Sequence, residues 1–122
     1  MKTIKLLFAI LIAFISMQSA NAQADKAERI STTKTQSIKV YGECGMCKKR
    51  IEKAANNVEG IKAANWNEDS QTLTIKYDVF TKDIIDNVQK KVAAVGHDTE
   101  KYKADDLVYQ ALPGCCHYAR KN

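Results

Sequence analysis

Long apolar segments, strong net charge and catalytic clusters are all scarce in this 122-residue sequence. After residue 22, no apolar run approaches the roughly 20 residues that a membrane-spanning helix needs. The formal net charge of +5 falls to +3 without Lys2 and Lys5, and basic and acidic residues are interleaved, so we expect no nucleic-acid partner. No carboxylate, serine or histidine cluster accompanies the cysteines, and we therefore predict that the protein is not an enzyme.

The first 22 residues have the pattern of a cleaved secretory signal. A positive start is followed by an apolar run over residues 6–17, and Ala20 and Ala22 supply the small residues that signal peptidase recognises. The run is too short for a membrane anchor, and no cysteine at the cleavage point indicates a lipoprotein. We therefore expect cleavage after Ala22 and a soluble protein in the periplasm or outside the cell.

The remaining chain divides into a lead-in, one domain and a tail. Residues 23–35 are polar without an apolar period, which predicts a flexible N-terminal segment. Residues 36–103 hold the regular apolar patterns and form the predicted domain. Residues 104–122 form a C-terminal extension that breaks at Pro113 and then carries a Cys-Cys-His cluster.

The apolar periods predict an α+β ferredoxin-like fold. Alternation indicates a strand near residues 38–40 and a hairpin over 61–78, and a helical period indicates one helix over 47–58 and a second from about Thr81 to Gly96. A short polar strand is expected over 97–104. The resulting β-α-β-β-α-β order places two helices on one face of an antiparallel sheet. The core residues expected from the strands are Ile38, Val40, Trp66, Leu73 and Ile75.

Four cysteines form two close pairs, one near each end of the domain and tail. In an exported protein, four cysteines first suggest two disulfides. The pairs Cys44–Cys47 and Cys115–Cys116 are nevertheless spaced more like two ligand clusters than like a framework spread over a fold.

The first pair lies where a predicted strand gives way to a helix. A thiol at a helix N-terminus feels the partial positive charge of free N–H groups, which favours the thiolate, and the basic residues 48–50 act in the same direction. Two thiolates separated by two residues can bind one soft ion, such as Cu(I). Closed zinc sites usually take four protein ligands, so a lone exposed pair suits transfer of the ion better than storage.

The stretch "VYGECGMCKKRIEKA", residues 40–54, resembles the heavy-metal-associated domain family. The matching features are the C-x-x-C pair, the Ile51-Glu52-x-Ala54 continuation, and the glycines at positions 42, 60 and 96. The resemblance runs from about residue 38 to 103 and implies the same fold, with reversible binding of Cu(I) through Cys44 and Cys47. It departs from the family at Glu43, where the loop is one residue short and the family methionine is missing. The signal and the tail resemble exported bacterial members, of the copper-chaperone or mercury-binding kind.

Further candidate ligands lie outside the first pair. His97 follows the glycine after the second helix, and the fold would place it near the metal loop. Cys115, Cys116 and His117 could form a second metal site, complete the first one, or enter disulfides with Cys44 or Cys47. The sequence leaves these alternatives open.

Two other functions compete with metal binding. A C-x-x-C pair at a helix start is also typical of thiol–disulfide oxidoreductases, but the element order differs and Pro113 is not placed before a strand that faces the pair. A domain stapled by two disulfides is the structural alternative.

The sequence thus predicts an exported soluble protein that carries or buffers Cu(I). Hg(II), Zn(II) and Ag(I) are the other ions that these ligands suit. The expected partner is a metal-transporting ATPase or an efflux component. The expected state is a monomer, with a metal-bridged dimer as the alternative.

Overall fold

The computed structural model describes residues 30–120, so the expected signal and most of the expected N-terminal segment lie outside the described residues. Within the described part, residues 31–120 belong to one compact unit. None of the helices in this described part is long and apolar enough to cross a membrane.

Within the described residues, three antiparallel strands form a sheet in the order β1-β3-β2. Their bounds are Thr33–Lys39 for β1, Ile61–Asn67 for β2 and Thr72–Asp78 for β3. Leu73 at the start of the central strand lies opposite both Ile38 and Trp66. Because side chains alternate between the two faces of a strand, these three share one face, and all three are buried.

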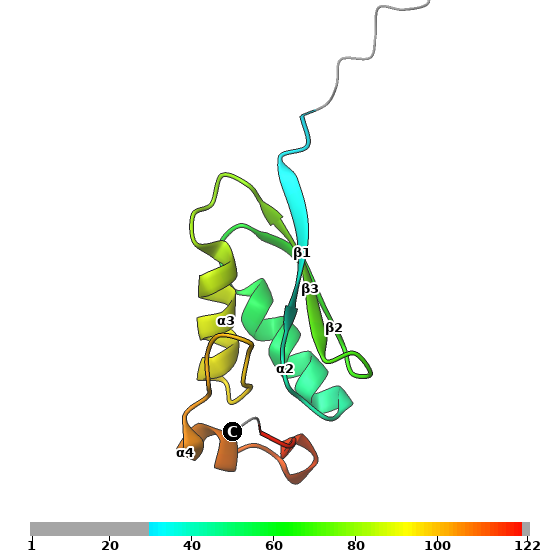
Figure 1. Cartoon of the computed structure of the whole chain (residues 1–122), viewed down its shortest axis with the longest axis vertical. Coiled ribbons are helices and arrows are strands. Elements are labelled where there is room, and N and C mark those ends of the chain that lie inside the picture. Colours follow the sequence, from blue (N-terminus) through cyan, green and yellow to red (C-terminus); the bar gives the residue numbers. More distant parts are fainter. Residues whose placement is uncertain (1–29, 121–122) are drawn as a thin grey trace, which may run out of the picture. The chain divides into compact units, whose positions relative to one another are not determined.

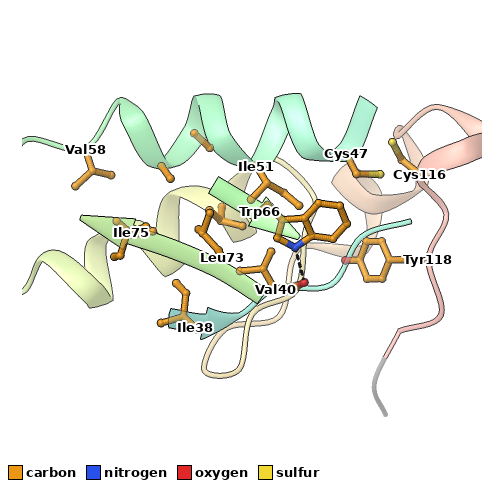
Figure 2. Close-up of a cluster of buried hydrophobic side chains, with 14 of the residues drawn as sticks. Ile38, Val40, Cys47, Ile51, Val58, Trp66, Leu73, Ile75, Cys116 and Tyr118 are labelled. Atoms are coloured by element: carbon orange, nitrogen blue, oxygen red, sulfur yellow. Dashed lines mark hydrogen bonds between the residues drawn. The ribbon is translucent and has the colours of Figure 1, made fainter. Parts of the chain in front are cut away.

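Two helices cover that face (Figure 1). α2 spans Gly45–Asn56 and α3 spans Ile84–Ala94. Each turns an apolar stripe inward, and the buried stripe residues are Cys47, Ile51, Ala54 and Ala55 of α2 and Ile84, Val88 and Val92 of α3. All five predicted strand residues join them in one core (Figure 2). The predicted ferredoxin-like fold is therefore confirmed.

The short fourth strand predicted over residues 97–104 is reduced to a single bridge between Val40 and Thr99. The Thr99 N–H donates to the Tyr102 carbonyl at 2.7 Å, and the Thr99 hydroxyl accepts from the Tyr102 N–H at 2.9 Å. These two bonds make a local turn, because a threonine hydroxyl can satisfy backbone groups that a strand would otherwise pair. The segment therefore folds back where an extended strand was expected.

The N-terminal boundary also differs from the prediction. β1 begins at Thr33, inside the segment that was expected to be flexible, and Thr33 lies opposite Asp78 of β3. Residues 33–37 are mostly exposed, so no apolar alternation marks them in the sequence. Pairing with β3 is what orders them.

The C-terminal extension packs onto the domain rather than leaving it. It contains α4 (Asp106–Gln110) and a 3₁₀ turn, η1 (Gly114–Cys116). Leu112, Cys116 and Tyr118 are buried in the same core as the sheet and helices. Figure 1 shows this extension lying across the end of the domain at which α2 begins.

Candidate metal centre

The loop between β1 and α2 is held tightly against the indole of Trp66. The indole Nε1 donates to the Val40 carbonyl at 2.9 Å, and the Gly42 N–H donates to the Gln71 side chain at 2.9 Å. A Cβ at Gly42 would lie 2.9 Å from the indole and 3.2 Å from the Cβ of Cys47. Only glycine allows this approach. The contacts with Trp66 and Gln71 therefore fix the position of the loop before α2 begins.

Cys44 and Cys47 stand at the first turn of α2. Cys44 is the N-cap residue and is half-buried, whereas Cys47 is completely buried on the inward face of the helix. Their Sγ atoms are 3.5 Å apart. The geometry therefore confirms that the two sulfur atoms of the C-x-x-C pair converge at a helix N-terminus.

The basic residues after the pair do not all act on it. Lys48 donates to the Trp66 carbonyl at 2.6 Å and forms an ion pair with Glu52 at 2.7 Å. Its charge is thus engaged beside β2 rather than at the sulfur atoms. The groups that favour the Cys44 thiolate are the neighbouring thiols and the backbone of Cys47 at the helix N-terminus.

The two tail cysteines lie at the same place. Cys115 Sγ is 2.9 Å from Cys44 Sγ, and Cys116 Sγ is 3.4 Å from it. The sulfur atoms of Cys44, Cys115 and Cys116 all lie within 4.8 Å of one another. Figure 2 shows the side chains of Cys47 and Cys116 facing each other in the core. No disulfide links any of the four, and Cys115 is the exposed member.

Three of the thiols, those of Cys44, Cys115 and Cys116, differ in how readily they ionise. Burial opposes ionisation of Cys44, but its hydrogen bonds with Cys115 and then with the other cysteines bring its pKa down to about 7. The hydrogen bond to Cys44 raises the pKa of Cys115, and burial raises that of Cys116. Of these three thiols, Cys44 is therefore the one that loses its proton most readily. A soft cation could replace the protons that hold these sulfur atoms together.

The two histidine candidates are not brought into this sulfur group. His97 is fully buried, its Nδ1 is 2.9 Å from the Tyr41 carbonyl, and its ring stacks on Tyr118. Burial lowers the pKa of His97, and its Nε2 has no hydrogen-bond partner within residues 30–120. His117 is exposed and lies beside the ring of Tyr109. In this structure His97 instead contacts the Tyr41 carbonyl, in the loop between β1 and α2 that carries Cys44.

Sequence reasoning missed the residues that hold the tail in place. The Tyr118 hydroxyl donates to the Gly96 carbonyl and accepts from the Asp98 N–H, both at 2.8 Å. Arg120 pairs with both carboxylate oxygens of Asp98, at 3.0 and 2.7 Å. Only the apolar–aromatic character of Tyr118 hints at burial in the sequence, and nothing there pairs Arg120 with Asp98.

Three comparisons with known proteins bear on this site. The model of the heavy-metal-associated domain matches residues 43–106, just over half of the chain. Heavy metal-associated isoprenylated plant protein 1 of Arabidopsis thaliana is 29% identical over 68 residues, which are 56% of this chain. That match covers only 28% of the plant protein, so the chain spans less than a third of this relative.

Two solved structures resemble the domain in both fold and sequence. A CopZ metallochaperone has a TM-score of 0.51 and 25% identity, and the match covers 54% of this chain and 98% of that one. The N-terminal domain of a potential copper-translocating P-type ATPase from Bacillus subtilis, in its Cu(I)-loaded state, has a TM-score of 0.50 and 26% identity. That match covers 55% of this chain and 84% of that one. Neither match is long enough to include the whole of this chain with its tail.

Proposed function

Because this chain belongs to the heavy-metal-associated domain family, we propose that it binds Cu(I) through Cys44 and Cys47 and carries or buffers the ion. One observation carries the proposal. The Cys44 thiol, with its pKa lowered to about 7, lies half-buried at a helix N-terminus, 3.5 Å from the Cys47 sulfur. A thiolate that forms near neutral pH beside a second thiol is the arrangement that a soft cation needs.

Cu(I) is the ion that the donor set and the relatives favour together. Sulfur donors select soft ions such as Cu(I), and the solved structures include a metallochaperone and a Cu(I)-loaded ATPase domain. Ag(I) and Hg(II) suit the same donors, and Zn(II) becomes a competitor where four thiolates converge. Metal binding displaces thiol protons, which a pKa of about 7 at Cys44 makes easier near neutral pH.

The setting of this activity is part of the proposal. The first 22 residues act as a secretory signal. Residues 23–35 are the N-terminal segment, and its last residues belong to β1. The domain and its extension work in the periplasm or outside the cell. A metal-transporting ATPase or an efflux component receives or supplies the ion. Its thiols exchange with those of Cys44 and Cys47, starting at the half-buried Cys44.

Competition for Cu(I) tests the proposal. The reduced protein is titrated against a chromophoric Cu(I) chelator of known affinity, beside the double variant C44S/C47S. We expect the variant to lose at least about tenfold in affinity, since its two remaining thiols lack the helix N-terminus. Equal affinity of the parent and the variant would remove the proposal. Repeating the titration with Ag(I), Hg(II) and Zn(II) ranks the ions.

Thiol–disulfide exchange is the second candidate, favoured by the 2.9 Å between the sulfur atoms of Cys44 and Cys115 and by the low pKa of Cys44. A redox protein must alternate between dithiol and disulfide at a useful rate. Reaction with a model disulfide peptide measures that rate. Exchange no faster than that of a simple thiol would leave metal binding as the function.

A further inference from the structure

We infer that the C-terminal extension is a built-in ligand arm, which adds the sulfur atoms of Cys115 and Cys116 to an ion held by Cys44 and Cys47. This inference rests on the proposed function and extends it from two sulfur donors to three or four. The family model ends at residue 106, so the tail pair lies outside the matched domain. The ligand is a soft cation, and Cu(I) is the probe.

The first argument is the position of Cys115. This residue is exposed on the tail, and no core packing explains where its side chain points. Its sulfur contacts are Cys44 Sγ at 2.9 Å and Met46 Sδ at 3.6 Å. An exposed thiol that lies in contact with another cysteine sulfur and a methionine sulfur is unlike a buried cysteine that acts as a small apolar side chain.

The second argument is that one segment holds both halves of the site. Within residues 96–98, the Gly96 carbonyl accepts from the Tyr118 hydroxyl and the Asp98 N–H donates to it. The Asp98 carboxylate also binds Arg120. The Asp98 carbonyl also accepts from the N–H of Tyr41, in the loop that leads to Cys44. The tail and the metal loop are thus positioned against the same few residues. Such preorganisation reduces the entropy that the tail would lose on binding an ion.

The third argument is the spacing of the sulfur atoms. For a metal–sulfur bond of about 2.3 Å, sulfur atoms around one ion are separated by roughly 3.8–4.6 Å. The thiols of Cys44, Cys115 and Cys116 already lie within 4.8 Å of one another. A small outward movement of each sulfur atom therefore admits one ion. With Cys47 and Cys116 buried, the ion would be shielded from solvent on the core side.

This arm changes how the ion is exchanged. A two-thiol site leaves the ion open to a partner's thiols, whereas a third sulfur from the tail occupies that position. A partner must then displace a tail sulfur, and exposed Cys115 is the one it reaches. The chain would hold Cu(I) more tightly and release it more slowly than a site built from two thiols alone. Each thiol that coordinates gives up its proton to the buffer.

The test compares the parent protein with C115S and with C115S/C116S. X-ray absorption on the protein loaded with one Cu(I) counts the sulfur donors, and we expect three or more in the parent and two in the double variant. The same variant should bind Cu(I) roughly a hundredfold more weakly and pass it faster to a chelator, because the arm acts at high effective concentration. C115S removes only an exposed thiol and keeps the buried thiol of Cys116 in the core. A loss of Cu(I) affinity in C115S therefore reports the loss of a ligand and not a folding defect.

Two further variants separate the arm from simple tail packing. Y118F keeps all four cysteines but loses the two hydrogen bonds that position the tail. Copper release should therefore accelerate, and the average number of sulfur donors should lie between that of the parent and that of C115S/C116S. Gln110→Ala, exposed in α4, should match the parent. Two sulfur donors in the parent with unchanged affinity in C115S/C116S would overturn the arm but leave the proposed function standing. If C44S/C47S also bound as the parent does, the proposed function itself would fall.

Discussion

At the scale of single residues, the site depends on how closely Gly42 approaches Trp66. The indole fills the space under the metal loop, donates to the Val40 carbonyl and lies beside Cys47. Gly42 is therefore required by packing rather than by an unusual backbone angle. Any side chain there has to move either the indole or the loop that carries Cys44.

Gly42→Ala should accordingly damage both stability and metal binding. The new Cβ would lie 2.9 Å from the indole, and the rigid ring cannot yield without shifting the loop. Overpacking of this kind costs about 1–3 kcal/mol. Urea unfolding followed by Trp66 fluorescence measures the loss, and competition for Cu(I) measures the displacement of the thiols.

Gly45→Ala is the matched control for that change. Gly45 is the first residue of α2, and a Cβ there would meet nothing within 4 Å. Alanine in a helix should be neutral or stabilising, by at most about 1 kcal/mol. Equal losses in the two variants would contradict the packing argument, because they would point to a general need for loop flexibility.

At the scale of elements, much of the domain follows from its periodicity. The stripes that predicted the helices also identify their buried faces, as Cys47 and Ile51 show for α2. The strand prediction was less complete at the two ends. β1 starts at Thr33 because polar residues can pair at a sheet edge, and the strand predicted at 97–104 turns at Thr99 because its hydroxyl binds the backbone. Neither event leaves an apolar signal.

The candidate site was predictable only where the motif is local. Cys44 and Cys47 lie on one turn, so their spacing alone brings them together. Cys115 reaches Cys44 across 71 positions, and that contact depends on tail anchors such as Tyr118 and Arg120. Long-range hydrogen bonds of this kind have no period or spacing in a sequence. The sequence therefore left metal ligation and disulfide formation open for the tail.

The contacts of Asp86 join α3 to the segment that follows it, and they should make the free energy of unfolding fall at acid pH. Asp86 accepts from Lys101, pairs with Lys90 at 2.8 Å and accepts from the Tyr102 hydroxyl at 2.6 Å. The hydrogen bond from Lys101, then those from Lys90 and Tyr102, hold the pKa of Asp86 well below its usual range. The carboxylate is therefore more stable in the folded than in the unfolded chain.

Asp86→Asn should be less stable than the parent at neutral pH, and the difference should shrink in acid. A depressed folded-state pKa contributes stability above the unfolded value of about 3.9 and loses it as the pH falls below that value. Urea midpoints between pH 7 and pH 3 measure the trend. Asp83→Asn is the control, since the Asp83 side chain makes no capping hydrogen bond and asparagine tolerates its positive φ of 55°. A constant difference across this range would contradict the assignment.

At the scale of the whole molecule, the domain and its extension share one core. Leu112, Cys116 and Tyr118 of the extension belong to the same buried cluster as Trp66 and Ile51. An extension held only by exposed contacts would detach at low cost. Because this one is buried in the shared core, the residues from β1 to the tail should unfold together.

Leu112→Ala tests this unity. The Leu112 side chain packs on Gly96, where α3 ends, and removing it should cost about 2–5 kcal/mol through lost contacts and a cavity. We expect one transition in urea, with the same lowered midpoint by Trp66 fluorescence and by far-ultraviolet circular dichroism. Leu107→Ala removes the same atoms from an exposed side chain of α4 and should stay within about 0.5 kcal/mol of the parent. Should Leu112→Ala leave the Trp66 transition in place, the tail would be a separate unit, and a ligand arm preorganised by the core would lose its physical basis.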